Sequence, residues 1–113
     1  MLFVYTTVKD ESEAVILSNN IIRERYAACA DFWPIRSIYT WEGFPEDVIQ
    51  YMVIFTTDEN KLERLIEYIK KLHSYKVPMI GTSEINIKNV DYQLWMKNYL
   101  FGEYDRYHND PKL

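Results

Sequence analysis

Two stretches of the sequence repeat one pattern: Leu2-Phe-Val-Tyr-Thr-Thr7 and Val53-Ile-Phe-Thr-Thr57. Each is a run of β-branched and aromatic residues that ends in a Thr pair, and each leads into an acidic pair, at 10–11 and at 58–59. The pattern indicates two copies of one strand-to-helix unit rather than a solenoid, because a solenoid needs at least three repeats. The repeat therefore predicts a fold made of two related halves.

Helical patterns follow both copies. Apolar residues recur at helical spacing over 10–26 and again over 62–73, and Asp10 with Glu13 is the signature of a capping box. A third, shorter pattern spans 92–100, with Asn89 before it as the expected N-cap. The sequence therefore predicts three helices.

Strand patterns fill the segments between the helices. β-Branched and aromatic residues dominate 32–41 and 48–56, which are separated by the turn residues 42–46, and a fourth strand is expected over 79–87. The order is β-α-β-β-α-β with one more helix. It predicts an α+β fold, the ferredoxin-like split βαβ sandwich, in which helices cover one face of an antiparallel sheet.

The composition suits one globular domain. Of the 113 residues, 48% are hydrophobic and 16% aromatic, so we expect a single domain over 1–101, followed by a polar C-terminal tail over 102–113. The net charge of −4 argues against nucleic acid as a partner, because phosphate binding needs clustered cations. No apolar run is long enough for a membrane span, and no signal peptide is recognisable. Because the single cysteine, Cys29, cannot form an internal disulfide, we expect a cytoplasmic location.

The strand pattern over 48–56 is apolar at both alternating positions. Helices on one side of a sheet leave the other face uncovered, and an uncovered face of this composition would expose a large apolar surface in a monomer. The pattern therefore predicts a homo-oligomer in which copies of the chain cover this face.

Four further motifs stand in order along the chain: Arg25-Tyr-Ala-Ala-Cys-Ala30, Ile35-Arg-Ser-Ile-Tyr-Thr-Trp-Glu-Gly43, His73-Ser-Tyr-Lys-Val-Pro78 and Asp91-Tyr-Gln-Leu-Trp95. Together they resemble the successive motifs of the CutA divalent-cation tolerance family over nearly the whole chain. The resemblance implies a compact homotrimer of ferredoxin-like subunits, clefts between the subunits, and an association with copper and other divalent cations. Members of the family have no agreed catalytic reaction, and some look like PII signalling proteins in architecture.

The sequence departs from the family pattern at several positions. The strand that usually ends in Lys-Thr-Thr ends here in Phe55-Thr-Thr57, so a cation that the resemblance implies near the subunit cleft is replaced. The usual His-Pro-Tyr-Glu-Val-Pro-Glu reads His73-Ser-Tyr-Lys-Val-Pro-Met79, so two carboxylates become Lys76 and Met79. Thr6 stands where bacterial relatives carry a cysteine that is tied to copper.

The candidate site also follows from the resemblance, because the family's Tyr-x-Trp-Glu-Gly stretch leads into a hairpin near the subunit cleft. Tyr39, Trp41, Glu42 and Tyr75 are the candidate ligand-binding residues, and His73 is the candidate metal ligand. The residues alone leave plainer interpretations open. Aromatic residues at this spacing are also typical of core or interface anchors, and a histidine that ends an apolar helix face is typical of a partly buried ring with local hydrogen bonds.

No catalytic template is found. The sequence contains no G-x-S-x-G, H-E-x-x-H or phosphate-loop motif, and its 3 glycines are too few for a glycine-rich loop. We therefore expect a non-enzymatic CutA-like trimer in divalent-cation tolerance or response, with a cation or small ligand at the subunit boundaries. The alternative is a PII-like signalling or adaptor trimer that docks a protein partner.

Overall fold

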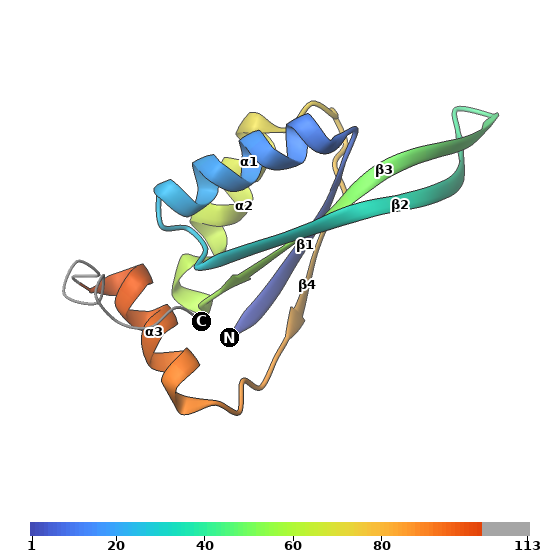
Figure 1. The fold of residues 1–113 in the computed structure, drawn as a ribbon. Helices are drawn as coiled ribbons and strands as arrows, with labels where there is room; N and C mark the ends of the chain where they lie inside the picture. Colours follow the sequence, from blue (N-terminus) through green and yellow to red (C-terminus); the bar gives the residue numbers. More distant parts are fainter. Residues whose placement is uncertain (103–113) are drawn as a thin grey trace.

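The computed structural model describes residues 1–102 of the chain. This part contains a four-stranded antiparallel sheet and three α-helices, in the predicted order β-α-β-β-α-β with a third helix at the end (Figure 1). The α+β prediction is confirmed, while the predicted tail lies, apart from Gly102, outside the described residues. The elements are β1 (Leu2–Val8), α1 (Glu11–Arg23), β2 (Cys29–Trp41), β3 (Phe44–Thr57), the 3-10 helix η1 (Glu59–Lys61), α2 (Leu62–Leu72), β4 (Ile80–Glu84) and α3 (Val90–Phe101).

The two copies of the repeat become the central strands of the sheet. The strand order is β2-β3-β1-β4, and β1 pairs antiparallel with β3, with Thr6 opposite Val53. β2 lies at one edge and contains Pro34. An edge strand tolerates proline because half of its N–H groups need no ladder partner.

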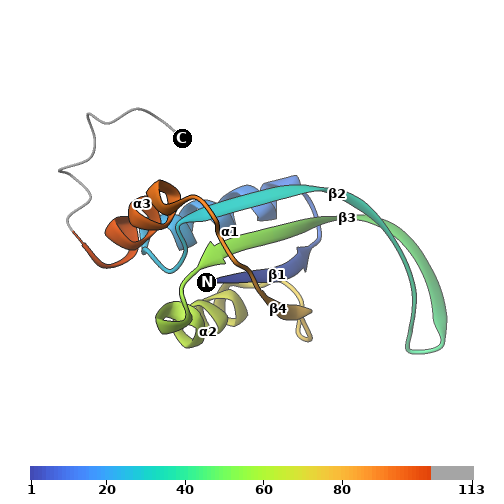
Figure 2. The same cartoon turned by 90° about the horizontal axis from the view of Figure 1, so that it is seen from below.

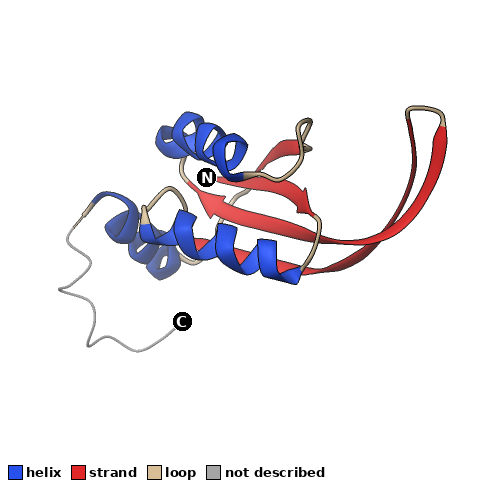
Figure 3. Ribbon diagram, turned by 90° about the horizontal axis from the view of Figure 1, so that it is seen from above, coloured by secondary structure: helices blue, strands red, loops and turns tan. Residues whose placement is uncertain are grey.

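The core lies between one face of the sheet and the helices α1 and α2, which Figure 3 shows side by side on the same side of the strands. Alternate residues of β1 and β3 point into it, as the period of two of a strand requires. Its largest fully buried side chains include Val4, Val8, Ile21, Val53, Phe55, Leu65 and Ile69.

Phe55 belongs to this core and is 0% exposed. Its register partner is Val4, which faces the same helices. The resemblance implies a cation near a subunit cleft at this position, whereas in this chain the side chain at position 55 is enclosed between the sheet and the helices. The phenyl ring fills core volume instead.

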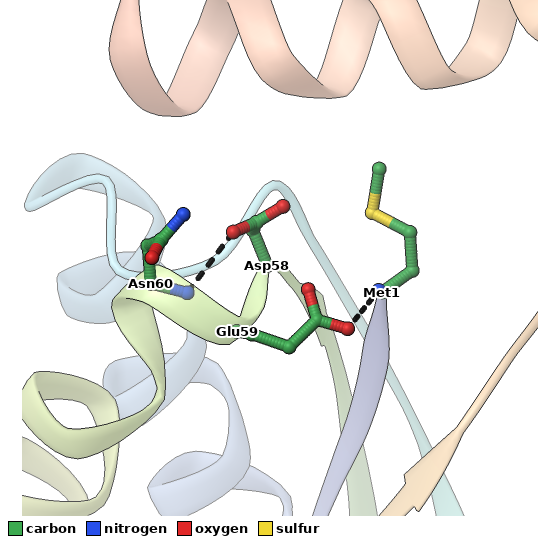
Figure 4. Close-up of polar contacts among 4 residues, drawn as sticks. All are labelled: Met1, Asp58, Glu59 and Asn60. Atoms are coloured by element: carbon green, nitrogen blue, oxygen red, sulfur yellow. Dashed lines mark hydrogen bonds and ion pairs between the residues drawn. The ribbon is translucent and has the colours of Figure 1, made fainter.

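The start of α2 and the beginning of the chain are joined by polar contacts (Figure 4). Asp58 is buried and caps η1 by accepting a hydrogen bond of 3.0 Å from the backbone N–H of Asn60. The next residue, Glu59, forms an ion pair with the amino group of Met1. These contacts fix the end of β3 and the start of the second helical unit beside the first residue of β1.

A second, smaller cluster attaches α3 to one end of the sheet. Met96 and Leu100 of α3 are buried with Ala28, which precedes β2. The predicted N-cap is confirmed, since the side chain of Asn89 accepts a hydrogen bond of 3.0 Å from the N–H of Asp91. None of the helices within residues 1–102 is long and apolar enough to cross a membrane.

Beyond the rest of the sheet, β2 and β3 continue as a two-stranded hairpin, visible as the long curved projection in Figures 1 and 2. β1 pairs with β3 only as far as Tyr51, so residues 35–50, called the arm below, pair with each other and with no further strand of the described chain. Ile38, Phe44 and Ile49 on the arm are 75%, 70% and 61% exposed. An isolated two-stranded hairpin is marginally stable in water, so the arm has the properties of a segment that packs against a partner.

The turn of the arm is tighter than predicted. The sequence indicates a turn over 42–46, whereas the chain reverses at Glu42 and Gly43 alone, with φ of 50° and 84°. Positive φ at both central residues gives the mirror-image turn whose twist matches that of paired strands. The rest of the predicted turn belongs to β3, where Phe44 already pairs with Trp41.

β4 is shorter than the predicted 79–87 and spans Ile80–Glu84. Its neighbour in the sheet is β1, whose first residue, Leu2, pairs with Glu84. β4 ends where that neighbour ends, because a strand needs a partner for its backbone groups.

Candidate functional site

A pocket of about 560 Å³ lies between the arm and the loop that joins α2 to β4. The arm contributes Tyr39 and Trp41, and the loop contributes Tyr75. The structure thus brings together three of the four residues predicted to bind a ligand. The fourth, Glu42, stands in the turn of the arm, is exposed, and does not line the pocket.

His73 ends α2 and holds the loop against the end of β1 through both ring nitrogens. Its Nδ1 accepts a hydrogen bond of 3.0 Å from the backbone N–H of Tyr75, so this nitrogen carries no proton. Its Nε2 lies 2.9 Å from the carbonyl oxygen of Thr7 and 3.1 Å from Oγ1 of Thr6. Because a carbonyl oxygen only accepts, Nε2 carries the proton and His73 is the neutral Nε2–H tautomer in this arrangement.

The hydrogen bonds of His73 compete with its predicted role as a metal ligand. A metal binds an unprotonated ring nitrogen through its lone pair, and the lone pair of Nδ1 already accepts the Tyr75 N–H. A metal on His73 would therefore have to break a bond that fixes the loop. Within one chain the ring acts as a positioning residue for Tyr75, whose ring lies 5.1 Å from it, centroid to centroid.

The phenol of Tyr75 is anchored across the pocket. Its hydroxyl donates a hydrogen bond of 2.9 Å to Oε1 of Gln50, a buried residue of β3. Burial raises the pKa of Tyr75, and the nearby Tyr39, Glu13 and Asp10 raise the pKa further, so the phenol is neutral at physiological pH. The pocket therefore presents an uncharged ring held by hydrogen bonds at both ends.

Glu13 of α1 fixes the same loop from the other side. Its carboxylate accepts hydrogen bonds from the N–H and Oγ of Ser74, at 2.9 and 2.8 Å, and from the N–H of Lys9 at 3.0 Å. Asp10 caps α1 by accepting from the N–H of Glu13 at 2.8 Å. The predicted capping box is therefore half formed: the cap is present, but Glu13 reaches Lys9 and the loop rather than the N–H of Asp10.

Burial raises the pKa of Glu13, but the hydrogen bonds from Lys9 and Ser74, together with the nearby His73, outweigh it, and the pKa lies below its ordinary value of 4.5. A lowered folded-state pKa stabilises the protein above about pH 4.5, and this contribution is lost as the pH falls through the folded-state value. The loop that forms the pocket is thus attached to α1 by a carboxylate whose ionised form the folded structure favours.

Glu13→Gln is expected to lower the free energy of unfolding by about 1 kcal/mol at pH 7, because an amide cannot accept all of these hydrogen bonds. The difference from the unchanged chain should shrink as the pH falls below about 4.5. Urea unfolding at a series of pH values measures it, with the exposed α2 residue Glu63→Gln as the control for loss of one charge. A difference that stays constant into acid would contradict the prediction.

Sequence reasoning missed Gln50 and Thr7 as lining residues, and it noted Lys76 and Met79 only as departures from a pattern. Gln50 carries a signal in retrospect, because it is a lone amide within the apolar run from Val48 to Phe55. Nothing in the sequence marks Thr7 as a lining residue, because its place in the pocket depends on how the loop between α2 and β4 packs beside β1.

Cys29 lies at the opposite end of β1 from His73. It pairs with Thr56 in the sheet, and its Sγ lies 3.8 Å from a carboxylate oxygen of Asp31. Burial raises the pKa of the Cys29 thiol and the charge of Asp31 raises it further, so the thiolate, the form that binds metals, is disfavoured.

Within residues 1–102 no three His, Cys, Asp or Glu side chains come together as a group that could hold a metal ion. Copper and zinc sites need two to four converging donors of these types. The donors of one chain therefore do not fit a preformed copper or zinc centre.

The fold and the pocket define a class: a small α+β domain with an apolar arm and a ligand-sized pocket beside it. The chain belongs to the CutA1 divalent ion tolerance protein family, whose family model matches residues 2–99. The family resemblance drawn from the sequence is confirmed.

Relatives and solved structures agree with this assignment. The divalent-cation tolerance protein CutA of Thermococcus kodakarensis is 34% identical over 101 residues, which cover 89% of this chain and 97% of the relative. That of Pyrococcus horikoshii is 38% identical over 96 residues, covering 85% and 94%. The crystal structure of CutA1 from Pyrococcus horikoshii superposes with a TM-score of 0.84 at 36% identity, covering 88% of this chain and 97% of that chain. CutA1 from Oryza sativa gives a TM-score of 0.82 at 35% identity, covering 87% and 91%.

Proposed function

We propose that this chain acts as a non-enzymatic homotrimer in a divalent-cation response, with ligand pockets at the boundaries between subunits. Membership of the divalent ion tolerance family is the observation that carries the proposal. The pocket beside the arm supports it, because the arm is the segment that most needs a partner and it supplies two walls of the pocket.

The helix-free face of the sheet supports the assembly. Val53 and Phe55 point to the helices, so their neighbours Met52 and Ile54 point to the opposite face, together with Trp33, which pairs with Met52 and is 43% exposed. Burial of apolar area is worth about 25 cal/mol per Å². Covering this face and the arm with further copies of the chain therefore provides a large driving force for association.

Because the donors of one chain do not fit a copper or zinc centre, we place any direct cation contact between chains, and copper is the first ion to test. His73 is the ring that such a contact would have to recruit. We place the protein in the cytoplasm, a reducing compartment that suits its free, half-buried Cys29.

Titration calorimetry with Cu²⁺ and with Zn²⁺ tests this function. Saturable heat is expected for at least one ion, and His73→Asn is expected to reduce it while keeping an acceptor for the Tyr75 N–H. Glu63→Gln, which removes a possible cation ligand at the opposite end of α2 from His73, is the control and should leave the heat unchanged. No heat with either ion would contradict the cation proposal and favour the PII-like adaptor alternative.

A further inference from the structure

We propose that the pocket beside the arm binds a small organic anion with a planar ring, held by its aromatic walls and by Lys76, rather than a bare divalent cation. The inference uses residues of a single chain. It does not depend on the cation response proposed above, and its probes meet the pocket as it stands in the assembled protein.

The residues that line the pocket carry charge of one sign. Of the described residues that line it, Lys76 alone carries a formal charge, and none is an aspartate, glutamate, histidine or cysteine. Bare divalent cations are bound by carboxylates, imidazoles, thiolates and clustered carbonyl oxygens. This chain has a cation, Lys76, and a thioether, Met79, at two positions where the family resemblance implies carboxylates.

The nearby carboxylates do not line the pocket, so the charge of its lining residues stays positive. Asp10 and Glu13 border a different hollow, on α1, and the carboxylate of Glu13 is occupied by Ser74 and Lys9. Glu46 is the register partner of Tyr39 on the arm but does not line the pocket. Among the described residues, Lys76 is the charged side chain that lines the pocket itself.

The walls fit a planar ring. Tyr39 and Trp41 come from the arm and Tyr75 from the loop, so aromatic surfaces enclose the space from two sides. Aromatic side chains offer large flat contact areas with well-defined stacking geometry. A volume of about 560 Å³ suits a small molecule of a few rings.

A hydrogen-bond donor is also in place. The Oε1 of Gln50 accepts the Tyr75 hydroxyl, so its amide N–H groups point elsewhere, and they have no partner among residues 1–102. Gln50 is 7% exposed as a whole residue, but its amide nitrogen is not a buried atom without a partner, so its N–H groups reach solvent and can donate to a bound molecule. A carboxylate provides acceptors for these groups and pairs with Lys76 at the same time.

Aromatic walls alone also attract ammonium groups through their ring faces. Lys76 should make the pocket prefer an anionic ligand, because its ammonium group repels a cation and attracts an anion. Three probes with one ring and different charge therefore test the inference: indole-3-acetate, which is an anion, tryptophol, which is neutral, and tryptamine, which is a cation.

The experiment follows backbone amide shifts by NMR while each probe is titrated into the full chain in metal-free buffer. Indole-3-acetate is expected to shift the signals of Thr7, Gln50 and Tyr75 and to bind about fivefold more tightly than tryptamine, the size of one exposed charge interaction. Lys76→Met should remove this preference and Lys76→Glu should reverse it. Lys88→Met, which changes another exposed lysine outside the pocket, should leave the preference unchanged.

Lys76 is exposed, so its variants are expected to fold, which their amide spectra verify. Tighter binding of tryptamine than of indole-3-acetate, shifts that map away from the pocket, or no shift with any probe at millimolar concentration would overturn the inference. Because no metal is present, these outcomes are independent of the calorimetric test of the cation response.

Discussion

Ile38→Lys combined with Phe44→Lys is expected to give a chain that sediments at its own mass of 13.6 kDa, whereas the proposed homotrimer of the unchanged chain would sediment at about three times that mass. The two side chains are 75% and 70% exposed on the arm, so neither contributes to the core of its own subunit. Burial of each against a partner is worth about 1.5–3 kcal/mol, and a buried unpaired ammonium costs more than that gain. At about 1.4 kcal/mol for each factor of ten, association should weaken by at least about 10²-fold.

Sedimentation equilibrium at micromolar concentration measures this mass. Ile16→Lys is the matched control, because Ile16 is 58% exposed on α1, away from the arm, and receives the same substitution. The control should keep the mass of the unchanged chain, and far-UV circular dichroism should show that all variants are folded. An unchanged chain that sediments at 13.6 kDa would remove the trimer, and with it the pockets at subunit boundaries.

The arrangement of the fold could be predicted because its signals are local. The repeat around the two Thr pairs marks β1 and β3, and the helical spacing over 10–26 and 62–73 marks α1 and α2. The predicted strand boundaries are wrong where a paired strand or a turn determines the end of a strand. The strand after Met79 ends early because β1 ends, and β3 begins at Phe44 because a two-residue turn suffices.

The candidate site could be predicted only in part. Tyr39, Trp41 and Tyr75 belong to recognisable motifs, and the structure brings them together. The partners of His73 could not be predicted, because its ring nitrogens bind backbone atoms of Thr7 and Tyr75, and backbone atoms leave no mark in the sequence. The contacts of His73 with residues distant in the sequence show that this candidate metal ligand holds the loop between α2 and β4 in place.

The environment of Phe55 also could not be predicted from the sequence alone. A motif comparison places its position near a cleft, and only the register of β1 with β3 shows that the side chain points into the core. Strand alternation fixes which residues share a face, but the sequence alone does not say which face the helices cover, since residues 48–56 are apolar on both.

Phe55→Ala is expected to lower the free energy of unfolding by about 3–5 kcal/mol, the usual effect of removing a fully buried phenyl ring and leaving a cavity. Phe101→Ala is the matched control, because Phe101 is 52% exposed at the end of α3, and its loss should cost less than about 1 kcal/mol. Urea unfolding gives both values, at one protein concentration because association adds to the apparent stability.

Phe55→Lys, which restores the family residue, separates a core position from a cleft position. In the core the ammonium would lie among apolar side chains and lose its hydration, so the variant should be at least as unstable as Phe55→Ala and should lose further stability as the pH falls and the amine becomes charged. At a cleft the lysine would reach solvent and the change would be nearly neutral. A Phe55→Lys chain that unfolds at the same urea concentration as the unchanged chain would contradict the core assignment, and with it the register that places Met52 and Ile54 on the helix-free face.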